Sequence, residues 1–253
     1  MAKAAGHENS AAHLAQAYKE NNIVHGVVMG NRTLQLADHE YPPFMSYCIG
    51  LDSTCYDGLN ISEQAGLVEQ HLQRQACVGI KLYPGYNHFY VADEKLAPFY
   101  ELARKYHKPV AIHTGLTATD NALLKYSHPL TLDDVAVAYP DVQFVMCHLG
   151  NPFLEAAIAV LEKNRNVSAD LSGLLEGKIT DMAAFFKKKR GYLGMLNDWL
   201  EYVDAYDRIM FGTDWPLANL GDYIAFVKHI VPEEHWNAVF YENAVRIYGL
   251  KGV

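Results

Sequence analysis

Short apolar runs alternate with amphipathic stretches along almost the whole chain. Seven runs predict strands, at residues 23–30, 47–52, 77–84, 109–115, 143–150, 167–173 and 209–216. The stretches between them repeat apolar residues with helical spacing, at residues 10–21, 62–75, 93–107, 131–139, 152–163, 181–205 and 219–230, with a closing helix near 233–248. Continuously apolar strands separated by single helices are typical of a parallel sheet covered by helices. No linker rich in proline, glycine or serine divides the pattern, so we expect one domain, residues 1–253.

The two faces of the predicted strands differ in composition. Val78, Ile80 and Leu82 share one face of their strand, while Gly79 and Lys81 share the other. The same split recurs in three further strands, at residues 109–115, 167–173 and 209–216. A branched apolar exterior and a small, polar interior fit a barrel with a polar mouth, whereas a doubly wound open sheet has two apolar faces. We therefore predict an α/β fold whose parallel sheet curls into a barrel.

Composition changes this picture mainly by exclusion. A chain of 253 residues that is 50% apolar can bury one large core. The formal charge of −8 argues against a nucleic-acid partner held through its phosphates. No secretory segment opens the chain, and no stretch approaches the roughly 18 apolar residues of a membrane span. We expect a soluble, cytoplasmic protein whose partner is a small-molecule substrate, with no membrane or nucleic-acid partner.

Three of the predicted strands end in residues of the kind that bind metals. The run PVAIHTG contains His113, QFVMCHLG contains His148, and RIMFGTDWP contains Asp214. The carboxyl ends of parallel barrel strands meet at one mouth, so we expect these side chains around a common hollow. A lone histidine at a strand end is more often a core residue than a ligand. Three such groups at one mouth favour a site, since histidine and carboxylate side chains are suitable ligands for a catalytic zinc.

Six segments of the chain resemble the amidohydrolase superfamily, in the branch that includes aminocarboxymuconate-semialdehyde decarboxylase: GIKLYP (79–84), PVAIHTG (109–115), MCHLGNP (146–152), NVSADLSG (166–173), RIMFGTDWP (208–216) and YENAVRIYGL (241–250). The resemblance implies an α/β fold, a distorted (β/α)8 TIM barrel of the metal-dependent hydrolase type, with a divalent metal, commonly zinc, at its mouth. It implies that His113 binds metal and that Asp214 binds metal or handles the proton of the metal-bound water. His148 corresponds to a second ligand or a proton-transfer group, so we expect catalytic roles for His148 and Asp214.

The resemblance breaks at the first strand, which in the family ends in HxH and supplies two metal ligands. His7 and His13 lie near the start of this chain, but neither belongs to such a motif. A barrel without that first strand leaves its second and eighth strands with open edges. These two correspond to the first and the last of the seven strands predicted here. Three explanations stay open: the strand is encoded upstream of a wrongly assigned start, the gene is a decayed or specialised copy, or residues 1–10 fill the gap irregularly. With His113 and Asp214 as the two ligands, we expect zinc to bind weakly or not at all.

Lys81 has two interpretations. In some binuclear relatives a lysine of the corresponding strand is carboxylated and bridges two metals. In the branch resembled here, we expect Lys81 to pair with a carboxylate such as Asp170 or Asp52. A buried lysine needs such a partner, so pairing is the favoured interpretation. Either way, Lys81 is expected to face the substrate.

Four other residues are candidates for binding the substrate. Arg32 follows the first predicted strand, where a guanidinium can hold a substrate carboxylate, although a surface position is equally compatible. Tyr83 and His88 belong to an aromatic loop after the third predicted strand, and Trp215 follows Asp214. These side chains either form the wall of a pocket for a planar ring or merely cap the barrel.

The leading hypothesis is a metal-dependent hydrolase that opens an amide, ester or lactone bond of a small carboxylated substrate. The alternative reaction is nonoxidative decarboxylation of an aromatic or enoic acid, in which His148 or Asp214 delivers a proton to carbon. The absence of HxH favours a third hypothesis, a catalytically inactive barrel kept for ligand binding or assembly. Aromatic residues in the 181–205 helix also favour a homodimer formed through outer helices.

Overall fold

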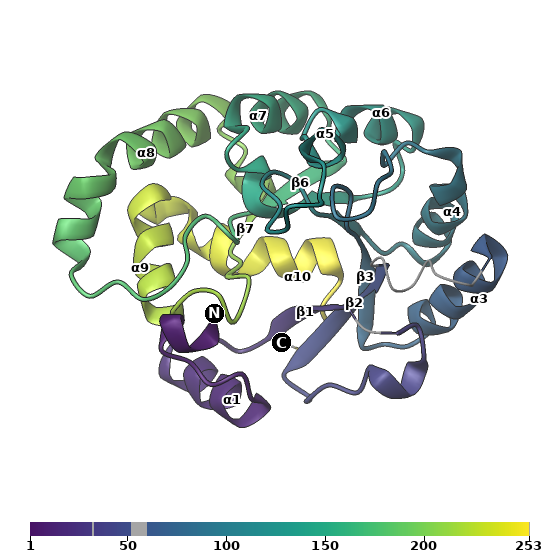
Figure 1. Ribbon diagram of the computed structural model, residues 1–253, viewed down its shortest axis with the longest axis horizontal. Coiled ribbons are helices and arrows are strands. Elements are labelled where there is room, and N and C mark those ends of the chain that lie inside the picture. The colour runs from purple at the N-terminus through teal and green to yellow at the C-terminus, as the bar shows by residue number, and fades with distance from the viewer. Residues whose placement is uncertain (32, 52–59, 253) are drawn as a thin grey trace.

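The computed structural model describes residues 1–31, 33–51 and 60–252, and it contains a single curled sheet (Figure 1). The seven strands are parallel and pair in chain order: β1 (Gly26–Gly30), β2 (Met45–Leu51), β3 (Cys77–Leu82), β4 (Val110–Ile112), β5 (Phe144–Met146), β6 (Val167–Asp170) and β7 (Ile209–Met210). All seven predicted strands are therefore confirmed. Within the described residues β1 and β7 do not pair with each other, so the fold is the predicted α/β barrel in a distorted, open form.

Helices follow the strands and cover the outside of the sheet (Figure 1). The longer ones match the predicted helices: α1 (Ala11–Glu20), α3 (Ile61–Leu72), α4 (Ala97–Tyr106), α6 (Thr131–Ala138), α7 (Leu154–Lys163), α8 (Met182–Val203) and α9 (Leu220–Ile230). The predicted closing helix is divided into three pieces: η6 (Glu233–His235), the π-helical η7 (Ala238–Glu242) and α10 (Asn243–Tyr248). Short turns complete the described chain: η1 (Ala2–Ala5), η2 (Leu36–Asp38), η3 (Glu94–Leu96), α5 (Leu124–Ser127), η4 (Cys147–Gly150) and η5 (Tyr206–Arg208). No helix in the described ranges is both long and apolar enough to cross a membrane.

Two separate cores lie on the two faces of the sheet. The outer core, between strands and covering helices, contains Ile80 and Leu82, as predicted. The inner core is small and includes Ala111, Cys147 and, contrary to the prediction, Val78. The pairing of β2 with β3 shifts at this point, because Tyr47 pairs with Cys77 and Cys48 with Gly79. Val78 is thus an extra residue in β3, and a bulge of this kind changes which face a side chain occupies.

The carboxyl-terminal helices close the edge of β7. The backbone N–H of Phe211 donates to the carbonyl of Val239 in η7 at 2.8 Å, and Asn243 Nδ2 donates to the carbonyl of Ile209 at 2.8 Å. α10 also contributes Ile247 and Tyr248 to the inner core on the concave side of the sheet. The expectation of an open edge at this strand is therefore wrong, because backbone groups there are satisfied by a helix and a side-chain amide.

The edge of β1 is different. Gly26 N–H donates to Phe44 O at 3.0 Å, so the alternate residues Val27 and Met29 direct their backbone groups away from β2. No described strand pairs with them there. The amino-terminal residues do not fill this edge as a strand. They form the turn η1 and lie against the loop after β7, where Asn219 Nδ2 donates to Ala5 O at 3.1 Å.

Candidate active site

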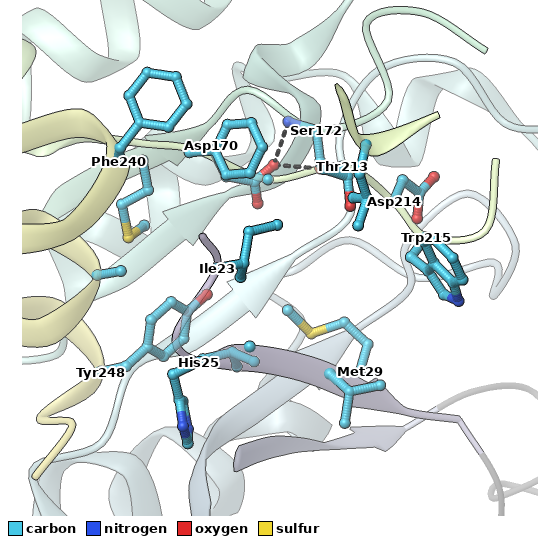
Figure 2. A pocket seen from close by; sticks show the side chains of 18 of the residues that line it. Ile23, His25, Met29, Asp170, Ser172, Thr213, Asp214, Trp215, Phe240 and Tyr248 are labelled. Carbon is cyan, nitrogen blue, oxygen red and sulfur yellow. Dashed lines mark hydrogen bonds between the residues drawn. The ribbon is translucent and has the colours of Figure 1, made fainter. Parts of the chain in front are cut away.

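A large cavity of about 1140 Å³ lies on the open side of the barrel. Residues from the carboxyl ends of β3 to β7 line its polar part: Lys81, Tyr83, His113, Cys147, His148, Asp170, Ser172, Asp214 and Trp215. Figure 2 shows Asp170, Ser172 and Asp214 on one side of the hollow and Met29 of β1 on the other. Phe240 and Tyr248 add an apolar wall from the carboxyl-terminal helices. The cavity combines a few converging polar groups with apolar walls, as small-molecule sites do.

His148 is held in one orientation by β6 and the loop that follows it. Its Nδ1 lies 2.8 Å from Ser172 Oγ, and Ser172 Oγ donates its own proton to Asp170 Oδ1. Because the only proton of the Ser172 hydroxyl goes to the carboxylate, Oγ must accept the hydrogen bond from His148 Nδ1–H. This arrangement fixes the tautomer and leaves Nε2 of His148 with its lone pair available to a substrate or a water.

The backbone around His148 is adapted to this orientation. His148 itself has a φ of 64°, in the left-handed region. Gly173 has a φ of +66°, and a Cβ at this position would lie 2.7 Å from His148 Nδ1. Asp214, the third of the strand-end residues, also has a positive φ of 53°. Non-glycine residues in this region are uncommon and cluster at functional sites.

Asp170 is a buried carboxylate that organises the loop. Its Oδ1 accepts hydrogen bonds from His148 N and Ser172 N, both at 3.0 Å, and from the Ser172 hydroxyl. Burial alone disfavours its charge, but the nearby imidazole of His148 and these hydrogen bonds bring the pKa of Asp170 below its ordinary value. Asp170 therefore stays ionised and serves as the anchor for His148.

The two site histidines are held neutral. Burial, followed by the charges of His148 and Lys81, holds the pKa of His113 well below its ordinary value. Burial also lowers the pKa of His148, although the carboxylates of Asp170 and Asp214 oppose the effect. The rings of His113 and His148 are 5.0 Å apart, and His113 Nε2 is buried with no hydrogen-bond partner. A buried polar atom without a partner in a cavity wall is a natural contact for a bound ligand.

Lys81 is buried beneath the polar part of the cavity, and the predicted ion pair with Asp170 is not among the described contacts. Its Nζ lies 2.7 Å from Cys147 Sγ, whereas no ion pair with Asp170 forms; Asp52 lies outside the described residues. Burial raises the pKa of the Cys147 thiol to about 12, so the sulfur stays protonated. Burial opposes the charge of Lys81, yet Cys147 and the carboxylates of Asp170 and Asp214 raise the pKa of Lys81. The cavity therefore has a positive charge at its base.

Asp214 and Trp215 form the rim of the cavity on the β7 side (Figure 2). Asp214 is exposed, and its carboxylate acts electrostatically on Lys81 and His148. The ring of Trp215 lies 4.0 Å from that of His7, whose Nε2 is 3.1 Å from Ala218 O. The amino-terminal segment thus supports Trp215 from behind and fixes one wall of the mouth.

Most of the predicted site residues therefore line one cavity: Lys81, Tyr83, His113, His148, Asp214 and Trp215. His88 is not brought there. It is exposed, its Nε2 lies 3.0 Å from Asn121 O, and its ring stacks on Tyr126. Arg32 lies outside the described residues.

Two residues of the site were not expected in their observed roles. From the sequence, Asp170 is expected only as a partner of Lys81, and Ser172 only as an inward-facing residue. The alternation in NVSADLSG places both on the same face of their strand, and this signal could have associated them with the site. Their bonds to His148 depend on the loop geometry around Gly173, which the alternation does not determine.

The described donor atoms do not by themselves suit a catalytic metal. Within the ranges that the structure describes, no group of three histidine, cysteine, aspartate or glutamate side chains is arranged to hold an ion. His113 Nε2 is one buried donor without a partner, whereas Asp170 Oδ1 already accepts three hydrogen bonds. A catalytic zinc needs three protein ligands and an open position. The sequence predicts two metal ligands, His113 and Asp214, and the described residues add no third ligand to them.

Residues 51–250 match the protein family described as Amidohydrolase, so the match covers most of the chain. The chain belongs to the amidohydrolase family. A curated relative, Protein fluG of Emericella nidulans, is 30% identical over 132 residues, which are 52% of this chain but only 12% of that protein.

Several solved structures share the barrel fold. The 5-carboxyvanillate decarboxylase LigW of Sphingomonas paucimobilis is 14% identical, with a TM-score of 0.65 over 97% of this chain and 84% of that one. A putative 2-pyrone-4,6-dicarboxylic acid hydrolase of Pseudomonas putida is 15% identical, with a TM-score of 0.63 over 96% and 88%. An amidohydrolase of Burkholderia multivorans with bound zinc is 15% identical, with a TM-score of 0.66 over 96% and 89%. These structural neighbours are thus a decarboxylase, a putative hydrolase and a zinc-bound amidohydrolase.

Proposed function

We propose that this chain is a hydrolase that opens an amide, ester or lactone bond of a small carboxylated substrate, with His148 as the general base. The observation that carries the proposal is the chain of contacts from Asp170 through Ser172 to His148 Nδ1. A base needs an unprotonated nitrogen in the cavity, and this chain of contacts reserves Nε2 for that role. The lowered pKa of His148 keeps the imidazole neutral at ambient pH, as a base requires.

The proposed reaction uses the described residues in sequence. His148 Nε2 takes a proton from a water, and the water oxygen forms a bond to the substrate carbonyl carbon. The tetrahedral intermediate then breaks its bond to the leaving oxygen or nitrogen, which receives the proton back from His148. Asp170 does not exchange protons in this scheme, since its part is to stabilise the oriented imidazolium through Ser172.

The substrate class follows from the charge and shape of the cavity. Lys81 gives the buried end a positive charge, which favours a substrate carboxylate and the negative charge that develops at the attacked carbonyl. Tyr83, Tyr86 and Trp215 line the same region and favour a planar ring. The Pseudomonas putida neighbour is named for a ring of this kind, a pyrone with two carboxyl groups, which supports the choice.

Decarboxylation is the second candidate, and the likeness to the 5-carboxyvanillate decarboxylase favours it. In that reaction the site must deliver a proton to carbon while carbon dioxide leaves. His148 would then have to carry a proton in the resting site, and its lowered pKa opposes this. The carboxyl group of Asp214, exposed at the rim of the cavity, is the alternative proton donor for this reaction. The oriented Nε2 lone pair of His148, together with its lowered pKa, supports hydrolysis ahead of decarboxylation.

A direct test measures both reactions on the same preparation. Hydrolysis of carboxylated lactones, esters and amides is assayed beside carbon dioxide release from hydroxybenzoate-type acids. We expect hydrolysis, and a loss of about 10²- to 10⁴-fold in kcat for His148→Asn. His88→Asn is the matched control, because His88 is an exposed histidine outside the cavity. Carbon dioxide release without hydrolysis would support the decarboxylase, and neither activity on any substrate would support the inactive barrel.

A further inference from the structure

Helix α8 has an exposed face opposite its buried one. Leu193, Leu196 and Leu200 are buried and attach the helix to the barrel. On the other side, Met195 is 39% exposed and Tyr202 is 63% exposed. Large apolar side chains exposed on the same face of one helix are a feature of interaction surfaces. In Figure 1 this helix lies at the outer edge of the molecule.

The same face is shaped for close approach by another helix. Its shallow hollow of about 540 Å³ is lined by Arg190, Gly191, Gly194, Met195, Asp198, Trp199 and Tyr202. A Cβ added at Gly191 or Gly194 would meet nothing within 4 Å, so neither glycine is required by packing inside this chain. Glycine in the middle of a helix costs about 0.5–1 kcal/mol relative to alanine. A close-packed neighbour on this face would account for both glycines.

Basic and acidic side chains occupy opposite halves of this helix. Lys187, Lys188 and Arg190 lie in its amino-terminal half, while Asp198 and Glu201 lie in its carboxyl-terminal half. Within the described residues none of these five side chains belongs to an ion pair. These charges therefore have no ion-pair partner in the part of the chain that the structure describes.

We propose that α8 docks against α8 of a second copy of this chain, antiparallel and around a two-fold axis near Gly194. Arg190 and Asp198 lie equally far from Gly194, and so do Lys187 and Glu201. At about 100° per residue all of them fall on one side of the helix, with Gly194 at the centre. A two-fold axis there brings Arg190 close to Asp198 of the partner subunit, and Asp198 close to Arg190 of the partner subunit. Because both complementary halves are on the same helix, a second copy fits this face by charge.

Sedimentation velocity of the full chain at several concentrations tests the proposal. We expect a dimer whose dissociation constant rises with salt, since the contacts are between exposed charges. Arg190→Glu and Asp198→Arg should each weaken the dimer by about tenfold or more, because one substitution places like charges together twice across the axis. The double variant R190E/D198R restores opposite charges and should restore the dimer. Glu94→Lys, an exposed charge reversal outside α8, is the control.

Several outcomes would overturn the proposal. A wild-type chain that stays monomeric at every concentration tested has no such interface. A dimer that tolerates both single reversals forms through another surface. If the double variant stays monomeric while its circular dichroism matches that of the wild type, Arg190 does not face Asp198 of the partner subunit. Disulfide cross-linking by Gly194→Cys under mild oxidation checks the axis independently, since residues on the axis meet their own copies.

Discussion

Ser172 Oγ lies 2.8 Å from His148 Nδ1 and donates its own proton to Asp170. The hydroxyl thus connects a buried, ionised carboxylate to an imidazole without letting the two touch. As a result the tautomer of His148 is determined by the protein before any substrate binds. Fixing a catalytic group in advance removes the cost of orienting it during the reaction.

Removing this hydroxyl should weaken catalysis more than binding. In Ser172→Ala the imidazole can adopt either tautomer, so we expect kcat to fall by about tenfold, the value of one hydrogen bond, with little change in KM. Steady-state kinetics on the best hydrolysed substrate measures this. Ser172→Thr keeps the hydroxyl and should retain more activity than the alanine variant. An unchanged kcat in Ser172→Ala would mean that the contact does not orient the base.

Gly173 should tolerate no side chain, for two reasons. Its φ of +66° costs an alanine about 1–2 kcal/mol, and the new Cβ would lie 2.7 Å from His148 Nδ1. We expect Gly173→Ala to lower both the free energy of unfolding and kcat, as measured by denaturant titration and kinetics. Gly66 in α3 is the matched control, since an added Cβ meets nothing within 4 Å there. Gly66→Ala should stabilise the helix by about 0.5–1 kcal/mol and leave kcat unchanged.

Measuring the zinc content of the purified chain tests whether its side chains can hold a catalytic zinc. The described ligand candidates are fewer than a catalytic zinc needs, so we expect less than one equivalent of zinc per chain after dialysis. The atom to follow is His113 Nε2, which is buried without a partner. If some zinc binds, His113→Gln should remove it, whereas His88→Gln should not. One tightly held equivalent in the wild type would contradict the prediction.

The sequence predicts the strands and the location of the site for a physical reason. Each strand is a continuous apolar run, and parallel strands end at one mouth, so His113 and His148 had to meet. The partner of Lys81 was beyond this reasoning. Lys81 is on β3 and Cys147 follows β5. Their contact therefore depends on how far these two strands, which are not neighbours, are offset from each other along the barrel axis. The alternation of residues along one strand contains no information about the offset between two strands.

The way in which the edge of β7 is closed shows a second limit of prediction from the sequence. Asn243 and Val239 come from a segment that reads as one closing helix, yet the structure divides it and includes a π-helical turn. That turn aims the Val239 carbonyl at the Phe211 N–H. Periodicity predicts a helix but not where its ladder of hydrogen bonds is interrupted. Such an interruption is determined by what the helix packs against, here the edge of a strand.

His71, which does not line the cavity, should control the acid stability of the fold. It is fully buried, its Nδ1 lies 2.8 Å from the Tyr47 hydroxyl, and its Nε2 lies 3.1 Å from Leu34 O. Burial, opposed by the hydrogen bond to Leu34, lowers the pKa of His71 from 6.5 to about 4. With one ring nitrogen donating and the other accepting, the neutral imidazole satisfies both contacts.

The sign of the effect on stability follows from which state binds the proton. Below pH 6.5 the unfolded chain protonates His71 while the folded chain does not, so the free energy of unfolding falls as the pH drops towards 4. The loss from this residue is at most about 3 kcal/mol, since each unit of pKa corresponds to about 1.4 kcal/mol. Urea titrations between pH 7 and pH 4 measure it. His71→Gln should be less stable at pH 7 and lose less on acidification, whereas His88→Gln should follow the wild type. An identical pH dependence in His71→Gln would mean that other groups cause the acid sensitivity.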